Sequence, residues 1–362
     1  MAVTIVTTGS DAERLSLHVS PLAELASLLH LLADPAHHLP FGALAQQMEG
    51  RLDASEQAEL RSLSPLWTGY RARFLYPIRA EGPADIATEI DSLLQLDELV
   101  FVEMSAWAVR GGNTGAPDRA QLTTGPGRRS VLERARSRSD SAHALARRLF
   151  DDPTAFRERV VQGLDLAAAA FASELRTVEA ALQVEAQRRR DLAARHGITA
   201  ALSGITTAAR VMSAPQRVVF DKLHRATIDL RRIPLLALPS VYAWPHLLVK
   251  HELGWPPIVQ YPLGAPGVRS DTPSLDTVRR RLSALIDPSR IRLCRLIARE
   301  ALSTTELAER TGLAVPQVSR LLRPLREQGL VSSSRRGHFV LYRLDLDVMS
   351  RLGPDLLNAL LR

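Results

Sequence analysis

The stretch Leu282–Asp345, LSALIDPSRIRLCRLIAREALSTTELAERTGLAVPQVSRLLRPLREQGLVSSSRRGHFVLYRLD, decides the fold of the C-terminal part of this 362-residue chain. Ser303 and Glu306 have the spacing of a capping box, which begins a short helix. That helix ends at Gly312, and a second helix follows and ends at Gly329. Two short helices joined by a tight, glycine-containing turn predict a helix-turn-helix.

The second of these helices has an apolar side and a polar side. At 100° per residue, Arg320 and Arg323 fall nearly opposite the apolar residues, and Gln317 and Ser319 flank them. Pro324 should bend the helix only after its first two turns. A helix that is held by its apolar side and presents Arg, Gln and Ser outward is typical of one that enters the major groove of DNA. The apolar residues are Val318, Leu321, Leu322 and Leu325.

Two β-favouring runs, Leu330–Ser334 and Phe339–Leu344, follow this helix and enclose a basic turn. Such a hairpin can lie along the DNA backbone or in the minor groove, and it completes a winged helix. The final stretch, Leu346–Leu361, is again helical. The candidate DNA-binding residues are Gln317, Ser319, Arg320, Arg323, Thr304, Thr305, Arg335, Arg336, His338 and Arg343.

The positive charge of the chain lies in its last quarter. Residues 273–362 contain 16 arginines and 9 acidic residues, so their net charge of +7 equals that of the whole chain. The preceding residues are neutral overall. A neutral body with a cationic module predicts that the module meets a polyanion such as double-stranded DNA, although a solvated basic surface would show the same charge.

These ninety residues resemble the winged helix-turn-helix of the ArsR-type bacterial transcriptional regulators. The resemblance rests on the order and spacing of Asp287-Pro288-Ser289-Arg290, Glu306-Leu307-Ala308, Val318-Ser319-Arg320, Leu325–Val331 and Tyr342-Arg343-Leu344. It implies a homodimer that is joined through the first and last helices of the module and places two recognition helices on a palindromic operator.

The upstream part resembles an uncharacterised domain that precedes such modules in actinobacterial regulators. The matching stretches are Val19–Leu25, Asp34-Pro35-Ala36 and Leu238–Pro245. With 46% hydrophobic residues, the chain is long enough for two or more cores. We predict a mainly α fold with small β portions: a helical N-terminal domain with a small β region, plus the C-terminal winged helix-turn-helix.

The module departs from the founding members of the ArsR family in two ways. Those proteins sense metals through paired cysteines near the helix that here begins at Ser303, whereas Cys294 is the only cysteine of this chain. We interpret Cys294 as a small buried hydrophobe, so metal sensing of the founding type is not expected. Ala314 also replaces the usual capping serine at the start of the recognition helix.

The N-terminal domain is predicted to span residues 1–262, with a hinge at 263–272 before the DNA-binding domain. Residues of about 110–140 are rich in Gly, Pro and Arg, which predicts a flexible loop. The pattern over Asp151–His196 predicts one long helix, with Gly197 as its left-handed cap.

Aromatic residues are concentrated in a short part of this domain, at Tyr242, Trp244, Trp255 and Tyr261. They either fill the space between a small sheet and the helices or line a pocket for an apolar ligand. With Phe171 from the long helix, they are the candidate ligand-binding residues. A body larger than the DNA-binding module suggests a sensor domain for a small-molecule effector.

Two groups of histidines could in principle bind a metal. They are His30, His37 and His38 near Asp34, and His246 and His251 near Glu252. Zinc needs three or four convergent ligands, and proximity along the chain does not show convergence. We therefore interpret these histidines as surface or structural residues and expect no metal and no cofactor.

The sequence thus predicts a homodimeric transcription regulator, a ligand-responsive repressor rather than an enzyme. No long apolar run and no secretion pattern are present, so we expect a cytoplasmic protein without a membrane partner. Two alternatives remain open: the winged helix serves as a protein-docking module, or the N-terminal domain is an enzyme tethered to DNA. Steep salt dependence of DNA binding would count against the first, and a cleft with perturbed titratable groups would favour the second.

Overall fold

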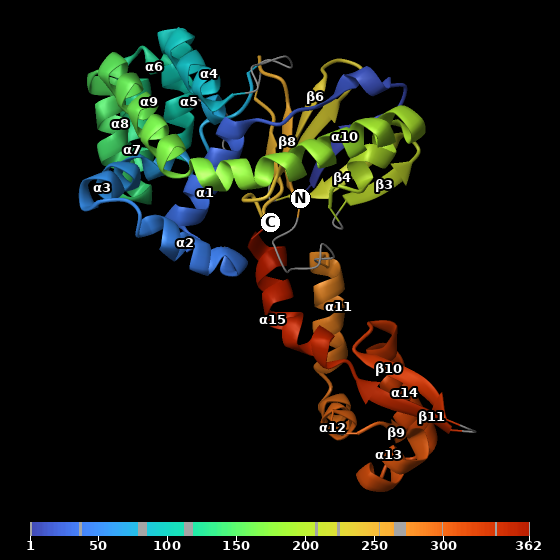
Figure 1. Cartoon of the computed structure of the whole chain (residues 1–362). Coiled ribbons are helices and arrows are strands. Elements are labelled where there is room, and N and C mark those ends of the chain that lie inside the picture. The colour runs from blue at the N-terminus through green and yellow to red at the C-terminus, as the bar shows by residue number, and fades with distance from the viewer. Residues whose placement is uncertain are drawn as a thin grey trace. The chain divides into compact units, whose positions relative to one another are not determined.

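The computed structural model describes residues 2–35, 38–78, 85–111, 119–206, 209–222, 225–252, 254–263, 273–298, 300–336 and 339–361. The chain forms two compact units, Met1–Ser270 and Asp271–Arg362. The predicted fold class is confirmed, because the described residues are mainly helical and form small sheets in both units (Figure 1). Apart from Leu263, the predicted hinge lies outside the described residues.

The N-terminal unit opens with two strands, β1 (Ala2–Val6) and β2 (Leu15–Leu17), and the helix α1 (Pro21–Ala33). The amide of Ala23 donates to the Ser20 hydroxyl, which caps α1. The helices that follow are α2 (Gly42–Glu49), α3 (Ala54–Leu63), α4 (Ile86–Asp91), α5 (Glu98–Arg110), α6 (Arg119–Leu122), α7 (Gly125–Arg138), α8 (Asp140–Asp151), α9 (Pro153–Ala170) and α10 (Ala172–Ser203).

The small β region that the sequence predicts for this unit forms two sheets. One sheet has the order β3-β4-β1-β5 and the other the order β2-β6-β8-β7. In the second sheet β2, β6 and β8 are parallel, and β7 is antiparallel to β8. The strands are β3 (Ala209–Ser213), β4 (Gln216–Asp221), β5 (Ala226–Asp229), β6 (Leu235–Ser240), β7 (Leu248–Lys250) and β8 (Ile258–Pro262).

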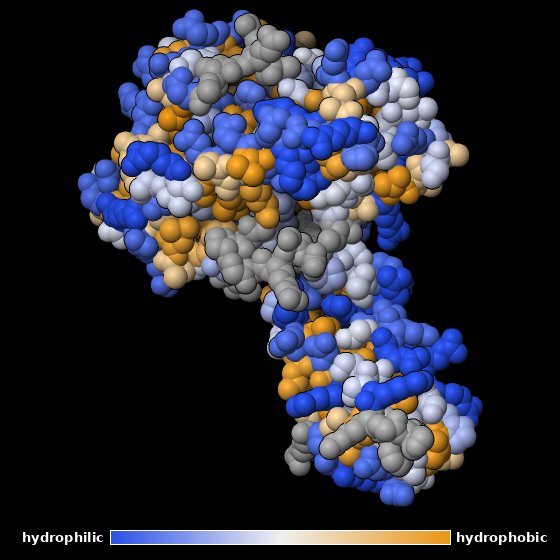
Figure 2. All heavy atoms as spheres, turned by 45° about the vertical axis from the view of Figure 1, so that its right-hand side comes forward, coloured by the Kyte–Doolittle hydropathy of each residue, from blue (hydrophilic) through white to orange (hydrophobic). Residues whose placement is uncertain are grey.

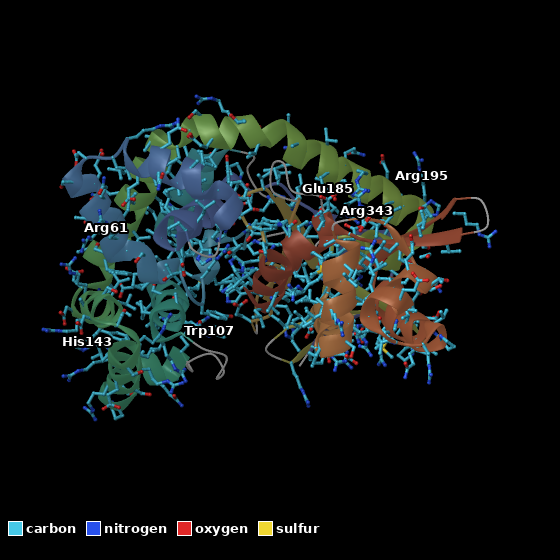
Figure 3. All side chains as sticks on the ribbon, turned by 90° about the horizontal axis from the view of Figure 1, so that it is seen from below. Arg61, Trp107, His143, Glu185, Arg195 and Arg343 are labelled. Carbon is cyan, nitrogen blue, oxygen red and sulfur yellow. The ribbon has the colours of Figure 1, made fainter. Side chains whose placement is uncertain are left out.

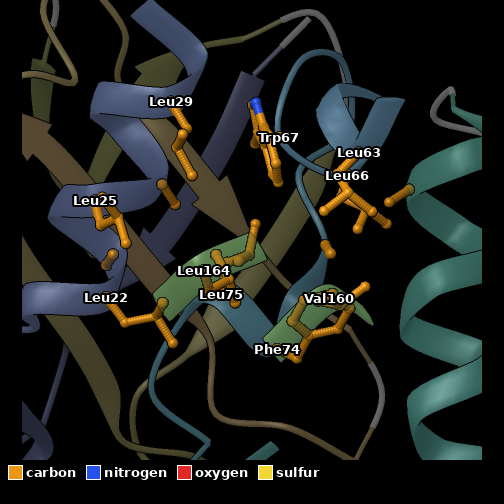
Figure 4. Packing of buried hydrophobic residues seen from close by; sticks show 14 of the residues in the cluster. Leu22, Leu25, Leu29, Leu63, Leu66, Trp67, Phe74, Leu75, Val160 and Leu164 are labelled. Atoms are coloured by element: carbon orange, nitrogen blue, oxygen red, sulfur yellow. The ribbon is translucent and has the colours of Figure 1, made fainter. Parts of the chain in front are cut away.

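The long helix α10 joins two hydrophobic cores of this unit. Val178 and Leu182 belong to the core between the helices, whereas Ala193 and Ile198 belong to the core under the sheets. Figure 1 shows α10 running from the helical side of the unit to the strands. In the first core, Leu22, Leu25 and Leu29 of α1 turn toward Leu75 and Leu164 (Figure 4).

The predicted single helix over Asp151–His196 is wrong in its middle and at its C-terminal end. The chain leaves helical geometry at Phe171, between α9 and α10. Gly197 has the expected positive φ of 81°, but the helix resumes after it and continues to Ser203. Buried Ile198 and Leu202 explain the continuation, because they place the extra turn against the second core.

The predicted flexible loop at about 110–140 is also wrong over most of its length. Helices α6 and α7 occupy it, and only residues 112–118 of it lie outside the described residues. Gly125, Pro126 and Gly127 stand in the first turn of α7, where proline is tolerated, and Thr124 caps that turn. Only Val131 and Ala135 of α7 are buried. An arginine-rich helix with so narrow an apolar face shows little periodicity.

The C-terminal unit contains the helix-turn-helix, the hairpin and the final helix that the sequence predicts, and one short strand, β9, that it does not. Its elements are α11 (Leu275–Leu285), α12 (Pro288–Ile297), β9 (Leu302–Ser303), α13 (Thr304–Thr311), α14 (Val315–Glu327), β10 (Val331–Arg336), β11 (Phe339–Leu344) and α15 (Leu346–Leu361). The strands form an antiparallel sheet in the order β10-β11-β9. Leu293, Leu307, Leu322 and Leu344 are among the residues of its core, so helices and hairpin share one interior.

The buried carboxyl of Glu89 makes the stability of the N-terminal unit depend on pH. It accepts a hydrogen bond from the Leu22 amide at 2.7 Å, and burial raises its pKa to about 7. Because this pKa lies above the unfolded value of 4.5, the contribution of Glu89 to the free energy of unfolding is full at low pH. That contribution is lost as the pH rises from the unfolded value to about 7.

We therefore expect Glu89→Gln to gain stability over the wild type between about pH 5 and about pH 8, by up to about 3 kcal/mol. Urea unfolding at the two pH values measures this change. Glu158→Gln, at an exposed position of α9, is the control. An equal difference between wild type and Glu89→Gln at both pH values would contradict the assignment.

Candidate nucleic-acid interface

Local hydrogen bonds begin α13, and a left-handed glycine ends it. The Ser303 amide donates to the Glu306 carboxylate at 2.7 Å, and the Glu306 amide donates to the Ser303 hydroxyl at 3.3 Å, which confirms the capping box. Gly312 has a φ of 73°, in the left-handed region that glycine reaches without strain. The first helix and its turn therefore set the direction in which α14 leaves.

Helix α14 presents the polar side that the sequence predicts. Val318, Leu322 and Leu325 are buried in the core of the unit, whereas Arg320 and Arg323 are exposed. Ser319 and Gln317 are exposed as well. The helix continues through Pro324 to Glu327, so the basic side is carried on one continuous element.

The exposed polar side chains of α14 differ in the contacts that they already make within the chain. Arg323 pairs with exposed Glu327 at 2.8 Å, an interaction that water screens strongly. The Nε of Arg320 donates to the Pro316 carbonyl at 3.3 Å. The Gln317 side-chain oxygen accepts from the Ala314 amide at 3.1 Å, which is the half of a capping box that does not involve the side chain of residue 314. Gln317 thus helps to begin the helix, a role that the sequence analysis did not assign to it.

The hairpin places its basic residues on two different faces. Ser332 pairs with Arg343, and Arg335 pairs with Val340. Since side chains alternate along a strand, Arg335 and Arg343 point to opposite faces of the hairpin. Both are exposed, and Arg343 is labelled in Figure 3.

The remaining candidate DNA-binding residues are Thr304, Thr305, Arg336 and His338. Thr305 is exposed at the start of α13, and Thr304 beside it is half-buried. Arg336 lies in β10 opposite Phe339. His338 lies outside the described residues.

The first and last helices of the unit, α11 and α15, pack against each other and retain exposed apolar side chains. The ion pair between Arg281 and Asp355, at 3.5 Å, links the two helices. The space-filling view in Figure 2 shows hydrophobic residues at the surface of this unit among hydrophilic ones. Exposed large apolar residues in the two helices or at their ends are Leu275, Ile286, Leu346, Leu357 and Leu360.

The aromatic residues proposed from the sequence as ligand contacts are packed in the N-terminal unit. Phe171, Tyr242 and Trp244 belong to the core between the helices, and Tyr261 belongs to the core under the sheets. Trp255 is half-buried against the first of these. Packing between the small sheet and the helices therefore accounts for the positions of these aromatic side chains. Their role in binding a ligand stays a prediction.

A pocket of about 260 Å³ lies elsewhere in this unit, among α1, α4, α9 and α10. Its apolar wall includes Ala168 of α9 and Leu175 and Leu182 of α10. The polar residues around it are Glu24, Asp85, Glu179 and Arg176. Burial raises the pKa of the Glu24 carboxyl, which accepts hydrogen bonds from the amides of Val241 and Tyr242. Asp85 and Glu179 outnumber the one basic group, Arg176, which favours a cationic ligand.

A network of buried charges lies between β7 and the segment before α4. Lys250 is 2% exposed, and burial lowers its pKa to about 7. Its ammonium donates to the Arg71 carbonyl and lies 3.5 Å from the centre of the Tyr70 ring. Glu252 accepts from the Tyr70 hydroxyl at 2.6 Å and lies 3.7 Å from Arg73. Since these groups bind one another and do not line the pocket above, we interpret the network as structural support.

The histidines that the sequence analysis treated as two separate groups are brought partly together. His30 and His38 of the first group meet His246 of the second. His251 is exposed, and His37 lies outside the described residues. Nothing in the spacing along the chain indicates this meeting, because His246 is more than two hundred residues from His30.

The elements of the C-terminal unit, with the exposed basic side of α14, define a winged helix-turn-helix. Residues 285–333 match the family model described as "Helix-turn-helix domain". Residues 1–267 match the model described as "Family of unknown function (DUF5937)". Since that match covers most of the chain, the chain belongs to the DUF5937 family. None of the described helices is long and apolar enough to cross a membrane.

Three curated bacterial proteins are similar to about a fifth of the chain. The arsenic resistance transcriptional regulator ArsR1 of Pseudomonas putida is 39% identical over 79 residues, which are 22% of this chain and 58% of that protein. A transcriptional repressor SmtB homolog of Synechocystis is 40% identical over 80 residues, 21% of this chain and 61% of that protein. The HTH-type transcriptional regulator NmtR of Mycobacterium tuberculosis is 35% identical over 79 residues, 22% of this chain and 66% of that protein. The chain thus spans less than two thirds of each relative.

Two solved structures are similar over a comparable share of the chain. One is the homodimeric winged helix-turn-helix DNA-binding domain of a possible ArsR-family regulator from Mycobacterium bovis, with 30% identity and a TM-score of 0.21. The similarity covers 22% of this chain and 75% of the chain from Mycobacterium bovis. The other is NolR from Sinorhizobium fredii, with 30% identity, a TM-score of 0.20, and coverage of 22% and 80%.

The start of α14 allows a direct test of its capping. Ala314 has the extended backbone of an N-cap, with φ −70° and ψ 144°, but its side chain has no acceptor. We expect Ala314→Thr to stabilise the C-terminal unit by about 1 kcal/mol over Ala314→Val, because only threonine supplies the oxygen. Thermal unfolding followed by circular dichroism compares these two variants of equal shape. Equal stability would show that an oxygen at position 314 does not cap α14.

Proposed function

We propose that this protein is a transcriptional regulator that binds double-stranded DNA through α14 and the hairpin of β10 and β11. The observation that carries the proposal is the orientation of α14, which buries its apolar side and exposes Arg320 and Arg323. The net charge of +7 over residues 273–362 supports it. The names of the three relatives support it as well, since each is called a transcriptional regulator or repressor.

The residues of the interface take different roles in this proposal. Arg320 contacts a base edge, because its terminal amino groups can form the bidentate pair that guanine accepts. Arg323 leaves its ion pair with exposed Glu327 and contacts DNA instead, and Ser319 contacts a base or a phosphate. Arg335 and Arg343, on opposite faces of the hairpin, contact phosphates. Gln317, Thr304, Thr305, Arg336 and His338 complete the proposed contact set.

The protein acts as a homodimer in this proposal, with α11 and α15 at the interface. The exposed apolar residues of these helices support this arrangement, because a second copy would cover them. A twofold dimer presents two copies of α14 to two half-sites, and it therefore reads a palindromic operator. We propose that binding represses transcription and that the N-terminal unit senses an effector rather than catalysing a reaction.

Selection of bound DNA from a random pool tests the function as a whole. We expect the full-length chain to select a sequence with two inverted half-sites and to bind it with a steep dependence on salt. Selection of no sequence, with little salt dependence, would favour a protein-docking module instead. Selection of single, unpaired half-sites would overturn the homodimer but not DNA binding.

Two arginine variants separate base contacts from phosphate contacts on the selected site. Arg320→Ala should lower specific affinity by about 1–3 kcal/mol and relax the preference at one position. Arg335→Ala should weaken all sequences alike and reduce the salt slope by about 1. Fluorescence anisotropy over a salt series measures both effects. Arg295→Ala, on the exposed side of α12, removes the same charge as a control. If Arg320→Ala behaves like Arg295→Ala, Arg320 does not read a base.

The effector part of the proposal rests on the acidic pocket among α1, α4, α9 and α10. A volume of about 260 Å³ suits a small ligand with an apolar body and a cationic group. We expect an arylalkylammonium probe to bind there and to change the affinity of the protein for its selected DNA site.

Leu175→Trp should fill this pocket and weaken binding of the probe at least about tenfold, as measured by calorimetry. Val184→Trp adds the same ring to an exposed position of α10, where Val184 is 68% exposed, and should bind the probe as the wild type does. Binding of the probe that Leu175→Trp leaves unchanged would exclude the pocket. Tight binding without a change in DNA affinity would exclude its regulatory role.

A further inference from the structure

Three histidine side chains converge inside the N-terminal unit. One potential ligand nitrogen each from His30, His38 and His246 lies within 4.8 Å of the other two. The Nε2 atoms of His30 and His246 are 3.3 Å apart. His30 and His38 are buried, and His246 is half-buried. The three come from different parts of the chain: α1, the segment just before the short helix η3 (Leu39–Phe41), and the loop between β6 and β7.

The three rings have nearly the same arrangement with respect to one another. Each pair of ring centres is separated by 5.1 Å, and the planes of the three pairs make angles of 78°, 68° and 73°. The cluster is thus close to threefold symmetric. Stacked or randomly packed rings would not produce three equal separations.

This geometry is the one that a tetrahedral metal ion imposes on imidazole ligands. Nitrogens at about 2.0–2.1 Å from a tetrahedral zinc ion are about 3.3 Å from one another, and the ring centres are about 5 Å apart. The 3.3 Å between the Nε2 atoms of His30 and His246 and the 5.1 Å between all three pairs of ring centres agree with these values. Imidazole nitrogen is also a ligand that zinc and its neighbours in the transition series prefer.

Hydrogen bonds of the surrounding backbone fix the three segments. The His246 amide donates to the Ala243 carbonyl at 2.7 Å, and the Ala243 amide donates to the Ser240 hydroxyl at 2.9 Å. The carbonyl of His38 accepts from the Phe41 amide at 2.8 Å. His30 stands in the last turn of α1, the most buried helix of the unit. The imidazoles are therefore held in place before any ligand arrives.

We propose that His30, His38 and His246 bind one zinc-like divalent transition-metal ion. In the part of the chain that the structure describes, no carboxylate or thiolate belongs to the cluster, so three neutral imidazoles supply the protein ligands. The fourth tetrahedral position is open to water or to a small exogenous ligand, and half-buried His246 marks the side nearest the solvent. The site is independent of the proposed binding of DNA.

Titration of the metal-free, full-length protein with Zn²⁺ against a competing chelator tests the site. We expect one tightly bound ion per chain, and a visible absorption band of tetrahedral Co²⁺ when cobalt replaces zinc. His30→Gln, His38→Gln and His246→Gln should each lower the affinity at least about 100-fold. His196→Gln, which removes an exposed imidazole of α10, should not change the affinity.

Absence of stoichiometric zinc binding, or a His246→Gln variant that binds as tightly as the wild type, would overturn the proposal. X-ray absorption of zinc on the wild-type protein gives a test that does not depend on the folding of any variant. It should show three imidazole nitrogens at about 2.0–2.1 Å. Fewer than three imidazoles, or a sulfur ligand, would equally overturn the site.

Discussion

The N-terminal unit depends on one constraint, which is that its helix α1 is buried on almost every side. Every residue from Leu22 to Leu31 is buried, so each polar group on the helix needs a partner from another element. The Leu22 amide binds Glu89, Glu24 binds the amides of Val241 and Tyr242, and the Ser27 hydroxyl accepts from Arg71 and Gln260. These bonds attach α1 to α4, to the end of β6 and to β8. The burial of α1 therefore fixes how α4, β6 and β8 are placed around it.

The same helix connects the two sites proposed for this unit. Glu24 in its first turn borders the acidic pocket, and His30 in its last turn belongs to the histidine cluster. The loop after β6 contributes to both neighbourhoods, because its amides bind Glu24 and its His246 completes the cluster. A ligand in the pocket and a metal on the histidines would therefore act on one rigid element. A helix that both ligands contact is an element through which two sites can be energetically coupled.

The C-terminal unit separates structural from functional residues along a single helix. The apolar side of α14 belongs to the core shared with β10 and β11, so the helix cannot rotate without exposing Val318, Leu322 and Leu325. The arginines opposite are consequently held outward by packing rather than by contacts of their own. Gln317 shows that the division is incomplete, because a residue on the exposed side also begins the helix.

The sequence by itself determined the elements whose signals are local. The capping box at Ser303, the left-handed Gly312 and the 3.6-residue apolar period of α14 each involve neighbours within a few residues, so the helix-turn-helix and its outward arginines were predictable. Only the tertiary structure decided where distant residues meet. It brought His246 to His30, packed the aromatic rings into two cores, and made a helix of the arginine-rich segment at α7. These outcomes depend on contacts between residues far apart in the chain, and a sequence pattern records only which residues are neighbours along it.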